Sequence, residues 1–543
     1  MAYEAVSHLL IRCSEWLGTE LLNAYDVNEK VQSIKEKLEW MHAFLQDAHK
    51  ISYCESSERA KLWVRQIVDI AHDAEDAIDI FTCVAAQSRR WSISKLVRDP
   101  RRRVARKIDK IIKAMNETII NRSLFGIENL PVGGGNASTA REVEEEEQVT
   151  SVVAEEGDVV GMDDDASLLV EKLMQGGAEG RGLVSIVESM SPIKARRLVK
   201  QHDGSGTCPN IMPTHFRSLL LFSNISIEKD VWKSICGFKL LRVLHLDSVS
   251  ISSNSLDGIE SLILLKYLGL MRTRTGFIPS TISNLHHLQT LDVRNNINFQ
   301  LPDDIWKFEQ LRHVRTENSV HPRYGWGGRI LIPNHVELGQ FVKLQTLTGV
   351  RAGDWMKTGM AGLVNVRKLA IDGVTEEYDP LFSTFKLPCL RSLKLSTKDG
   401  CPIPSLSAFS NNSHLYAMYL DGPLEDLTGL HQFPAVLSKL NLRHSGLQQD
   451  SMATLEMLPN LRVLYLDKGS YVEKEMIITA EGFQRLQVLT LNLVTEIEEL
   501  IVEEGAMPGL THLTIEDCEN LREVPQGLRS RTGIQKLVFN RPI

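Results

Sequence analysis

A short hydrophobic pattern returns again and again along the C-terminal part of the chain. It consists of an apolar residue, two variable residues, a second apolar residue, one variable residue and a third apolar residue, as in Leu461 to Leu466. Twelve of the thirteen steps between copies are 22 to 25 residues long. The copies start at Phe216, Leu241, Leu265, Leu288, Leu311, Leu344, Val366, Leu390, Leu415, Leu437, Leu461, Leu486, Leu510 and Ile534. The chain therefore contains an internal repeat of about 14 copies between residues 205 and 543.

The spacing inside each copy predicts a short strand. The second and third apolar residues are two apart, so in a strand they point to the same side. The length of the repeat is that of leucine-rich repeats. Each copy can bury its leucines only against its neighbours, which predicts a parallel α/β solenoid with a concave, strand-lined binding face. The one long step, from Leu311 to Leu344, predicts a projecting loop around Tyr324 to Gly328.

Residues 1 to 125 have the spacing of helices instead. Apolar residues recur there at intervals of three and four, which is typical of amphipathic helices. The four stripes are Val6, Leu10, Cys13, Leu17 and Leu21; Ile34, Leu38, Met41 and Leu45; Trp63, Ile67, Ala71, Ala74, Ile78 and Phe81; and Ile108, Ile112, Met115 and Ile119. Four such helices can bury their stripes against one another, which predicts an all-α four-helix bundle. The chain is thus expected to be multidomain, with a linker over 126 to 204.

Acidic residues gather on the third predicted helix. Glu75, Asp76 and Asp79 lie beside its apolar stripe. Spacing alone is compatible with a solvated helix face and with a docking site for basic residues elsewhere in the chain.

The segments around these acids resemble a known domain. Leu38 to Ala48, Trp63 to Gln66 and Asp73 to Asp79 are similar to the Rx-type coiled-coil domain of plant intracellular immune receptors, the coiled-coil NLR family. The hallmark EDVID motif of that domain is matched with one substitution. The resemblance implies that the acids pack against arginines of the repeats, and Arg294 and Arg315 are the candidates. Residues 1 to 20 also resemble in part the family's MADA motif, whose helix inserts into membranes.

Two runs of opposite charge lie on either side of the predicted end of the helical block. Residues 89 to 113 hold eleven Lys and Arg against two acids, and residues 142 to 165 hold eleven acids. The basic run suits an anionic membrane surface or RNA, or else a solvated or self-pairing segment, and the last interpretation is preferred.

Residues 159 to 187 resemble the start of the nucleotide-binding NB-ARC module of the same family. A phosphate-binding loop with Gly-Lys-Ser/Thr should follow Val187, but the chain continues instead through Glu188 to Arg197. The family's ATP/ADP site is therefore expected to be deleted, and no cofactor is predicted. A real deletion, a spliced form and an error in the gene model all remain open.

Composition narrows the classes of function. The net charge of -8 and the pI of about 6.1 give no reason to expect nucleic-acid binding. The N-terminus is not a secretory signal and no run is long enough for a membrane span. Eight cysteines without a C-x-x-C pair favour the cytoplasm, with peripheral contact at the plasma membrane as an alternative. No nucleophile with a paired base and no metal spacing is recognisable, so the chain is not expected to be an enzyme.

The concave face is the expected binding surface. Its candidate residues are the variable positions around the inner leucines: His245, Asp247, Asp292, Tyr419, Arg443, Tyr465 and Asp467. The resemblance implies a disease-resistance receptor that recognises a pathogen effector or a guarded host protein through the repeats and signals through the coiled coil. Its expected partners also include other NLR receptors and its own coiled-coil domain. Two alternatives stay open, a regulatory adaptor or decoy for full-length receptors, and a membrane-active inducer of cell death.

Overall fold

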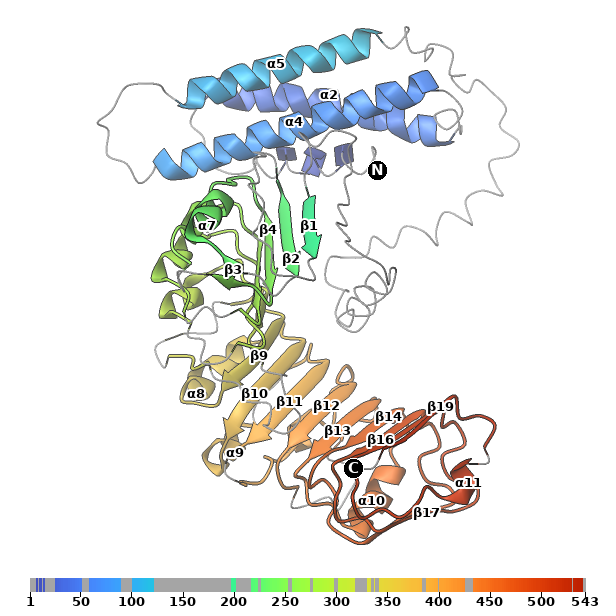
Figure 1. The fold of residues 1–543 in the computed structure, drawn as a ribbon. Coiled ribbons are helices and arrows are strands. Elements are labelled where there is room, and N and C mark those ends of the chain that lie inside the picture. The colour runs from blue at the N-terminus through green and yellow to red at the C-terminus, as the bar shows by residue number, and fades with distance from the viewer. Residues whose placement is uncertain are drawn as a thin grey trace. The chain divides into compact units, whose positions relative to one another are not determined.

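Figure 1 shows the computed structural model of the chain, which forms two compact units, Met1–Ala178 and Glu179–Ile543. The structure describes residues 6–7, 9–11, 13–14, 25–50, 58–88, 100–121, 197–201, 216–222, 226–251, 256–273, 277–296, 301–317, 330–333, 336, 341–382, 387–398, 400–424, 433–529 and 531–540. The predicted loop around Tyr324, the segment 159 to 187 and most of the N-terminal motif lie outside these residues.

The first unit is helical. Its long helices are α2 (Tyr25–Lys50), α4 (Glu58–Ser88) and α5 (Pro100–Ile120), and the described residues between 6 and 14 are also helical. The buried core follows the predicted stripes: Val6, Leu9, Cys13, Val31, Ile34, Leu38, Met41, Leu45, Trp63, Ile67, Ala71, Ala74, Ala77, Ile78, Ile108, Ile111 and Met115. The indole Nε1 of Trp63 donates to the carbonyl of Thr118 at 3.1 Å, which ties α4 to α5. The predicted helical domain is confirmed.

The second unit is built on one 15-stranded parallel sheet in which strand order follows chain order. Fourteen of its strands coincide with the predicted repeats, and β1 precedes them. The strands are β1 (Arg197–Gln201), β2 (Ser218–Phe222), β4 (Val243–Asp247), β6 (Tyr267–Met271), β7 (Thr290–Asp292), β8 (His313–Arg315), β9 (Thr346–Arg351), β10 (Lys368–Val374), β11 (Ser392–Thr397), β12 (Ala417–Asp421), β13 (Lys439–Arg443), β14 (Val463–Leu466), β16 (Val488–Asn492), β18 (His512–Glu516) and β19 (Lys536–Asn540). The predicted solenoid is confirmed.

The core of the solenoid consists of the repeated leucines. Leu244 and Leu246 of β4, and Leu464 and Leu466 of β14, are fully buried, and the equivalent residues of neighbouring strands stack on them. Because side chains alternate along a strand, the residue between each pair of leucines points to the opposite side. Every repeat therefore places one residue of its strand on the concave side of the sheet.

Short elements cover the other side of the sheet, where Figure 1 shows α7, α8 and α9. The helices are α7 (Lys229–Cys236), α8 (Trp355–Gly359), α9 (Asp379–Phe382), α10 (Gln449–Glu456) and α11 (Gln526–Arg529), and the 3₁₀ helices are η3 (Ile259–Ser261), η4 (Ser280–Asn284), η5 (Asp303–Lys307), η8 (Met360–Gly362), η9 (Glu376–Tyr378) and η10 (Ser407–Phe409). Two small parallel sheets join β3 (Ser226–Ile227) to β5 (Ser250–Ile251) and β15 (Glu475–Ile478) to β17 (Glu499–Val502). This outer layer closes the core.

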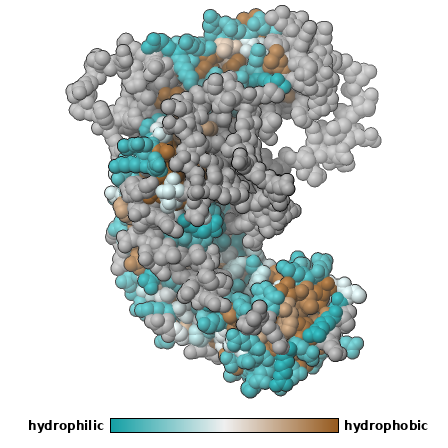
Figure 2. Space-filling view, viewed as in Figure 1, coloured by the Kyte–Doolittle hydropathy of each residue, from teal (hydrophilic) through white to brown (hydrophobic). Residues whose placement is uncertain are grey.

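The last repeat is less covered than the others. Leu537 of β19 is 44% exposed, whereas Leu513, its partner on β18, is fully buried. Ile534 and Phe539 are only partly buried. Figure 2 shows hydrophobic residues gathered on the surface of this C-terminal region. The difference follows from position, because no strand in the described residues pairs with the outer side of β19.

Candidate protein-binding face

Two columns of side chains define the concave face. From β4 to β18 the central column holds the residue between the two inner apolar residues of each strand, in register across the sheet: His245, Gly269, Asp292, Arg315, Thr348, Ala370, Lys394, Tyr419, Asn441, Tyr465, Thr490 and Thr514. The flanking column lies two residues further along each strand and includes Asp247, Arg294, Glu317, Asp372, Asp421, Arg443, Asp467, Asn492 and Glu516. All seven predicted concave candidates fall in these two columns. Whether they bind a partner stays a prediction.

His245 is part of a partly buried aromatic cluster. Its ring centroid lies 5.1 Å from that of Phe222 and 5.9 Å from that of Tyr267, and its Nδ1 is 3.2 Å from the Tyr267 hydroxyl. Burial lowers the pKa of His245, although the carboxylates of Asp247 and Asp292 oppose that effect. Asp247 itself accepts two hydrogen bonds from Arg272, at 2.9 and 2.6 Å. Both candidates are therefore engaged within the repeats.

Asp292 holds two arginines together. Its side chain is 1% exposed and accepts two hydrogen bonds from the Arg294 guanidinium, from Nε at 2.9 Å and from Nη2 at 2.8 Å. Arg315 Nη1 lies 3.8 Å from the same carboxylate. Asp292 thus offsets part of the positive charge of Arg294 and Arg315. These are the two arginines that the sequence analysis proposed as docking partners for the acids of the helical unit. A net charge of +1 remains on the three side chains.

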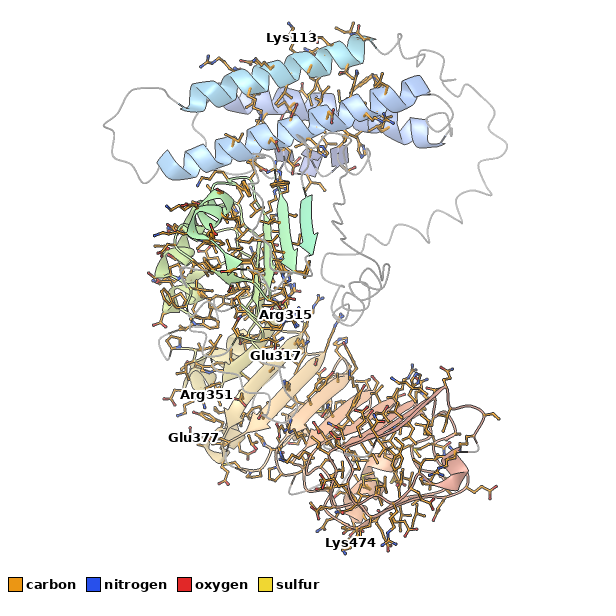
Figure 3. The ribbon with its side chains drawn as sticks, in the orientation of Figure 1. Lys113, Arg315, Glu317, Arg351, Glu377 and Lys474 are labelled. Atoms are coloured by element: carbon orange, nitrogen blue, oxygen red, sulfur yellow. The ribbon has the colours of Figure 1, made fainter. Side chains whose placement is uncertain are left out.

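A second ion pair bridges β8 and β11 (Figure 3 labels Arg315 and Glu317). Lys394 Nζ lies 3.4 Å from Glu317 Oε2. Burial alone would raise the pKa of Glu317, but the nearby charges of Lys394 and Lys368 outweigh it, so this pKa is lowered. Burial lowers the pKa of Lys394, with Glu317 opposing. Lys394 and Glu317 therefore neutralise each other's charge in the middle of the concave face.

Arg443 lies between two acids of the flanking column. Its side chain is 3% exposed, with Nε 3.9 Å from Asp421 Oδ2 and Nη1 3.8 Å from Asp467 Oδ2. Neither nitrogen has a hydrogen-bond acceptor within the described part of the chain. Asp421 also lies 2.8 Å from His444 Nδ1, and Asp467 accepts from Asn492 at 3.0 Å. The Arg443 guanidinium therefore offsets the negative charges of Asp421 and Asp467, and it is too buried to be offered to a partner.

Two tyrosines enclose a lysine on β12, β13 and β14. Lys439 Nζ lies 5.5 Å from the ring centroid of Tyr419 and 5.6 Å from that of Tyr465, within the range of a cation–π contact. Asn441 lies between the tyrosines in the central column. A shallow pocket begins here, lined by Lys394, Leu395, Tyr419, Leu420, Asp421, Asn441 and Arg443. This region offers a partner large rings with polar tips, which are enriched at binding hot spots.

The acids of the helical unit are deeply buried. Glu75 is 8% exposed, Asp76 2% and Asp79 0%. Carboxylates in such a setting are stable only with polar or basic partners. Their predicted docking on Arg294 and Arg315 stays a prediction.

Sequence reasoning missed three residues of the face. Arg272 lies one residue beyond the flanking column, Glu317 lies just past the end of β8, and Lys439 precedes Asn441 by two residues. The position of Lys439 carried a signal, because residues two apart on a strand share a side. Glu317 pairs with a residue 77 positions away, for which the sequence holds no local signal.

The described residues carry neither a metal-binding cluster nor a membrane-spanning helix. That part of the chain has no group of three or more His, Cys, Asp or Glu side chains able to hold a metal ion. It also has no helix that combines the length and the apolar character needed to span a bilayer.

Residues 215–539 match the family described as leucine-rich repeat region. The chain belongs to the leucine-rich-repeat family. Residues 5–110 match the Rx N-terminal domain. No match to the nucleotide-binding module was found. The chain thus combines an Rx N-terminal domain with a leucine-rich-repeat region, as the resemblance implied.

Curated relatives come from Arabidopsis thaliana. The disease resistance protein RPP8 is 30% identical over 370 residues, which cover 65% of this chain and 39% of RPP8. The probable disease resistance RPP8-like protein 2 is 28% identical over 373 residues, with the same coverage of 65% and 39%. The chain therefore spans about two fifths of the length of the curated relatives it matches. Its similarity to RPP8-type coiled-coil NLR disease resistance proteins is distant.

Two solved structures show weak similarity to this one. An internalin from Listeria monocytogenes has 14% identity and a TM-score of 0.36, covering 57% of this chain and 83% of the internalin. A leucine-rich-repeat protein from Leptospira interrogans has 16% identity and a TM-score of 0.37, covering 64% of this chain and 96% of that protein.

Proposed function

We propose that this chain is a cytoplasmic recognition protein of plant disease resistance. Its repeats bind a pathogen effector or a guarded host protein, and its helical unit passes the signal to another receptor without a nucleotide switch. Similarity to disease resistance proteins supports the biological setting. The absence of a phosphate-binding loop after Val187 supports the lack of a switch.

The observation that carries this proposal is the make-up of the concave face. The parallel ladder from β12 to β14 holds Tyr419, Asn441 and Tyr465 in register, and Asp421 and Arg443 flank them. Tyrosines and charged groups on a rigid, extended sheet are typical of protein-binding surfaces. A partner bound there would contact several repeats at once.

A non-enzymatic role agrees with the chemistry of the described cysteines. Burial raises the pKa of Cys236 to about 12 and that of Cys518 to about 11. Thiols with such pKa values carry almost no thiolate at neutral pH and are poor nucleophiles. These two cysteines are therefore best explained as core residues.

A second candidate function is that of a regulatory adaptor or decoy that binds full-length receptors. The jump from Val187 to the Ala195 region favours it, because a chain without a switch still keeps both binding units. The two candidates predict different partners, an effector or host target in the first case and a full-length NLR receptor in the second.

The test is a retention experiment with the full chain and matched variants. Wild type, the concave variant Tyr419→Ala with Tyr465→Ala, and the outer-face control Glu481→Ala are presented with a panel of pathogen effectors and with full-length receptors. Retention by wild type and control, with loss by the concave variant, supports recognition through this face. Equal retention by all three would refute it, and the class of retained protein separates the two candidate functions.

A further inference from the structure

The two halves of the central column differ in whether their polar side chains already make contacts inside the repeats. From β4 to β11 three polar members are occupied inside the repeats, His245 by Tyr267, Asp292 by Arg294, and Lys394 by Glu317, and Thr348 is fully buried. A partner would have to break these contacts to use those groups. The occupied half therefore presents little uncommitted hydrogen-bonding capacity.

From β12 to β18 the column changes character. Five adjacent strands carry Tyr419, Asn441, Tyr465, Thr490 and Thr514 in one register, and these residues form what we call the uncharged row. All five are half-buried, so their polar tips are accessible. For Asn441, Tyr465, Thr490 and Thr514 the described structure contains no side-chain hydrogen bond. Their donors and acceptors are thus available to a ligand.

The chemistry of the row specifies the ligand. An amide side chain carries both a donor and an acceptor, and a hydroxyl can act as either. This combination matches the N–H and C=O groups of a peptide main chain. A carboxylate or phosphate ligand is disfavoured, because Lys439 is held between the two tyrosine rings, Arg443 lies between Asp421 and Asp467, and Asp467 and Glu516 flank the rest of the row. Neutral dipoles fit the row best.

The dimensions agree with a peptide. Neighbouring strands lie about 4.8 Å apart, so five strands span roughly 19 Å. An extended chain advances about 3.3 Å per residue, so about six residues would cross the row. Lys439, Val463, Val488 and His512 border the row on one side, and Asp421, Arg443, Asp467, Asn492 and Glu516 of the flanking column border it on the other. A ligand with apolar side chains opposite Val463 and Val488 and basic ones opposite Asp467 and Glu516 would be complementary.

We propose that the uncharged row binds the main chain of an extended peptide segment of the partner, laid across β12 to β18. This inference rests on the proposed function and narrows it, since it names the part of the face and the form of the bound segment. Asn441 would hold one peptide group through its amide, Tyr465, Thr490 and Thr514 would hold peptide groups further along the segment, and Tyr419 would pack against the first residue.

The test uses a phage library of random linear peptides panned against the full chain. A selected peptide is then synthesised, and its Kd is measured for wild type, Asn441→Leu, Tyr465→Phe and Thr490→Val. Each variant removes hydrogen-bonding atoms at nearly constant shape, and because the wild-type side chains make no internal hydrogen bonds, folding should be unchanged. Thr290→Val on β7 is the matched control on the same sheet face. We expect about tenfold weaker binding to Asn441→Leu and no change for the control.

A second peptide, N-methylated along its backbone, tests main-chain recognition. It should bind wild type weakly, and Asn441→Leu should weaken it no further. If the selected peptides bind all variants equally, the row is not their site, although recognition elsewhere on the face would stand. If wild type retains no linear peptide, the extended-peptide proposal is overturned, and the effector panel still decides the proposed function by itself.

Discussion

Asp292→Asn is the perturbation whose effect can be worked out most directly from the structure. The Asp292 carboxylate is 1% exposed and accepts two hydrogen bonds from Arg294 while lying 3.8 Å from Arg315. Removing one partner of a buried ion pair costs about 3 to 5 kcal/mol. Arg294 and Arg315 keep side-chain exposures of 27% and 16%, so water can solvate part of their charge. We therefore expect a smaller loss of local stability, about 2 kcal/mol.

Hydrogen exchange of the full chain measures this loss. Two amides report on it: Val293 donates to the carbonyl of Arg315 at 2.8 Å, and Asn295 donates to that of Glu317 at 3.0 Å. Because about 1.4 kcal/mol corresponds to a factor of ten, these amides should exchange roughly 30-fold faster. Distant repeats and the helical unit should be unaffected, since repeats contact only their neighbours. Glu309→Gln, an exposed acid of the same repeat, should change nothing. Unchanged exchange in Asp292→Asn would refute the assigned role of Asp292.

Three further predictions follow from other contacts. His245 has a lowered pKa, so protonation favours the unfolded state; stability from the neutral ring is present above about pH 6.5 and is lost below it. Exchange in β4, corrected for intrinsic rates, should accelerate between pH 7.5 and 5.5 in wild type but not in His245→Phe, and equal acceleration would contradict the assignment. Leu464→Ala removes a fully buried anchor and should cost about 3 kcal/mol, seen as lost protection in β13 and β16 with α4 unchanged; loss throughout the chain would argue against local coupling. Charge reversal at Glu75, Asp76 and Asp79 should abolish binding between fragments 1 to 125 and 205 to 543, with Glu36→Lys as control. Binding should return with Arg294→Glu and Arg315→Glu, and binding that survives the reversal at unchanged helix content removes the docking hypothesis.

The sequence predicts the backbone of this protein well because its signals are local. The spacing of Leu464 and Leu466 is enough to place a strand and its buried side, and the stripe from Trp63 to Ile78 is enough to place α4. Side-chain partners are a different matter. Glu317 and Lys394 meet only because β8, β9, β10 and β11 pair in a fixed register, across a step of 33 residues that breaks the repeat length.

Arg294 illustrates what local reasoning can still supply. The sequence analysis assigned it to the acids of the helical unit on the strength of the family resemblance. In the structure it is bonded to Asp292, two residues earlier. Residues two apart on a strand share a side, so this contact was within reach of the pattern alone. The docking hypothesis now has to include Asp292 as a competitor for the same guanidinium.

The claim at the centre of this account is that the C-terminal half of the concave face binds a protein partner. A hydrogen-exchange footprint of the full chain, recorded with and without a retained effector or receptor, tests it most directly. The account predicts slower exchange in peptides that cover β12, β13, β14, β16 and β18, with α7 and α10 on the outer side unchanged. Protection confined to the outer helices, with the sheet unchanged, would contradict it.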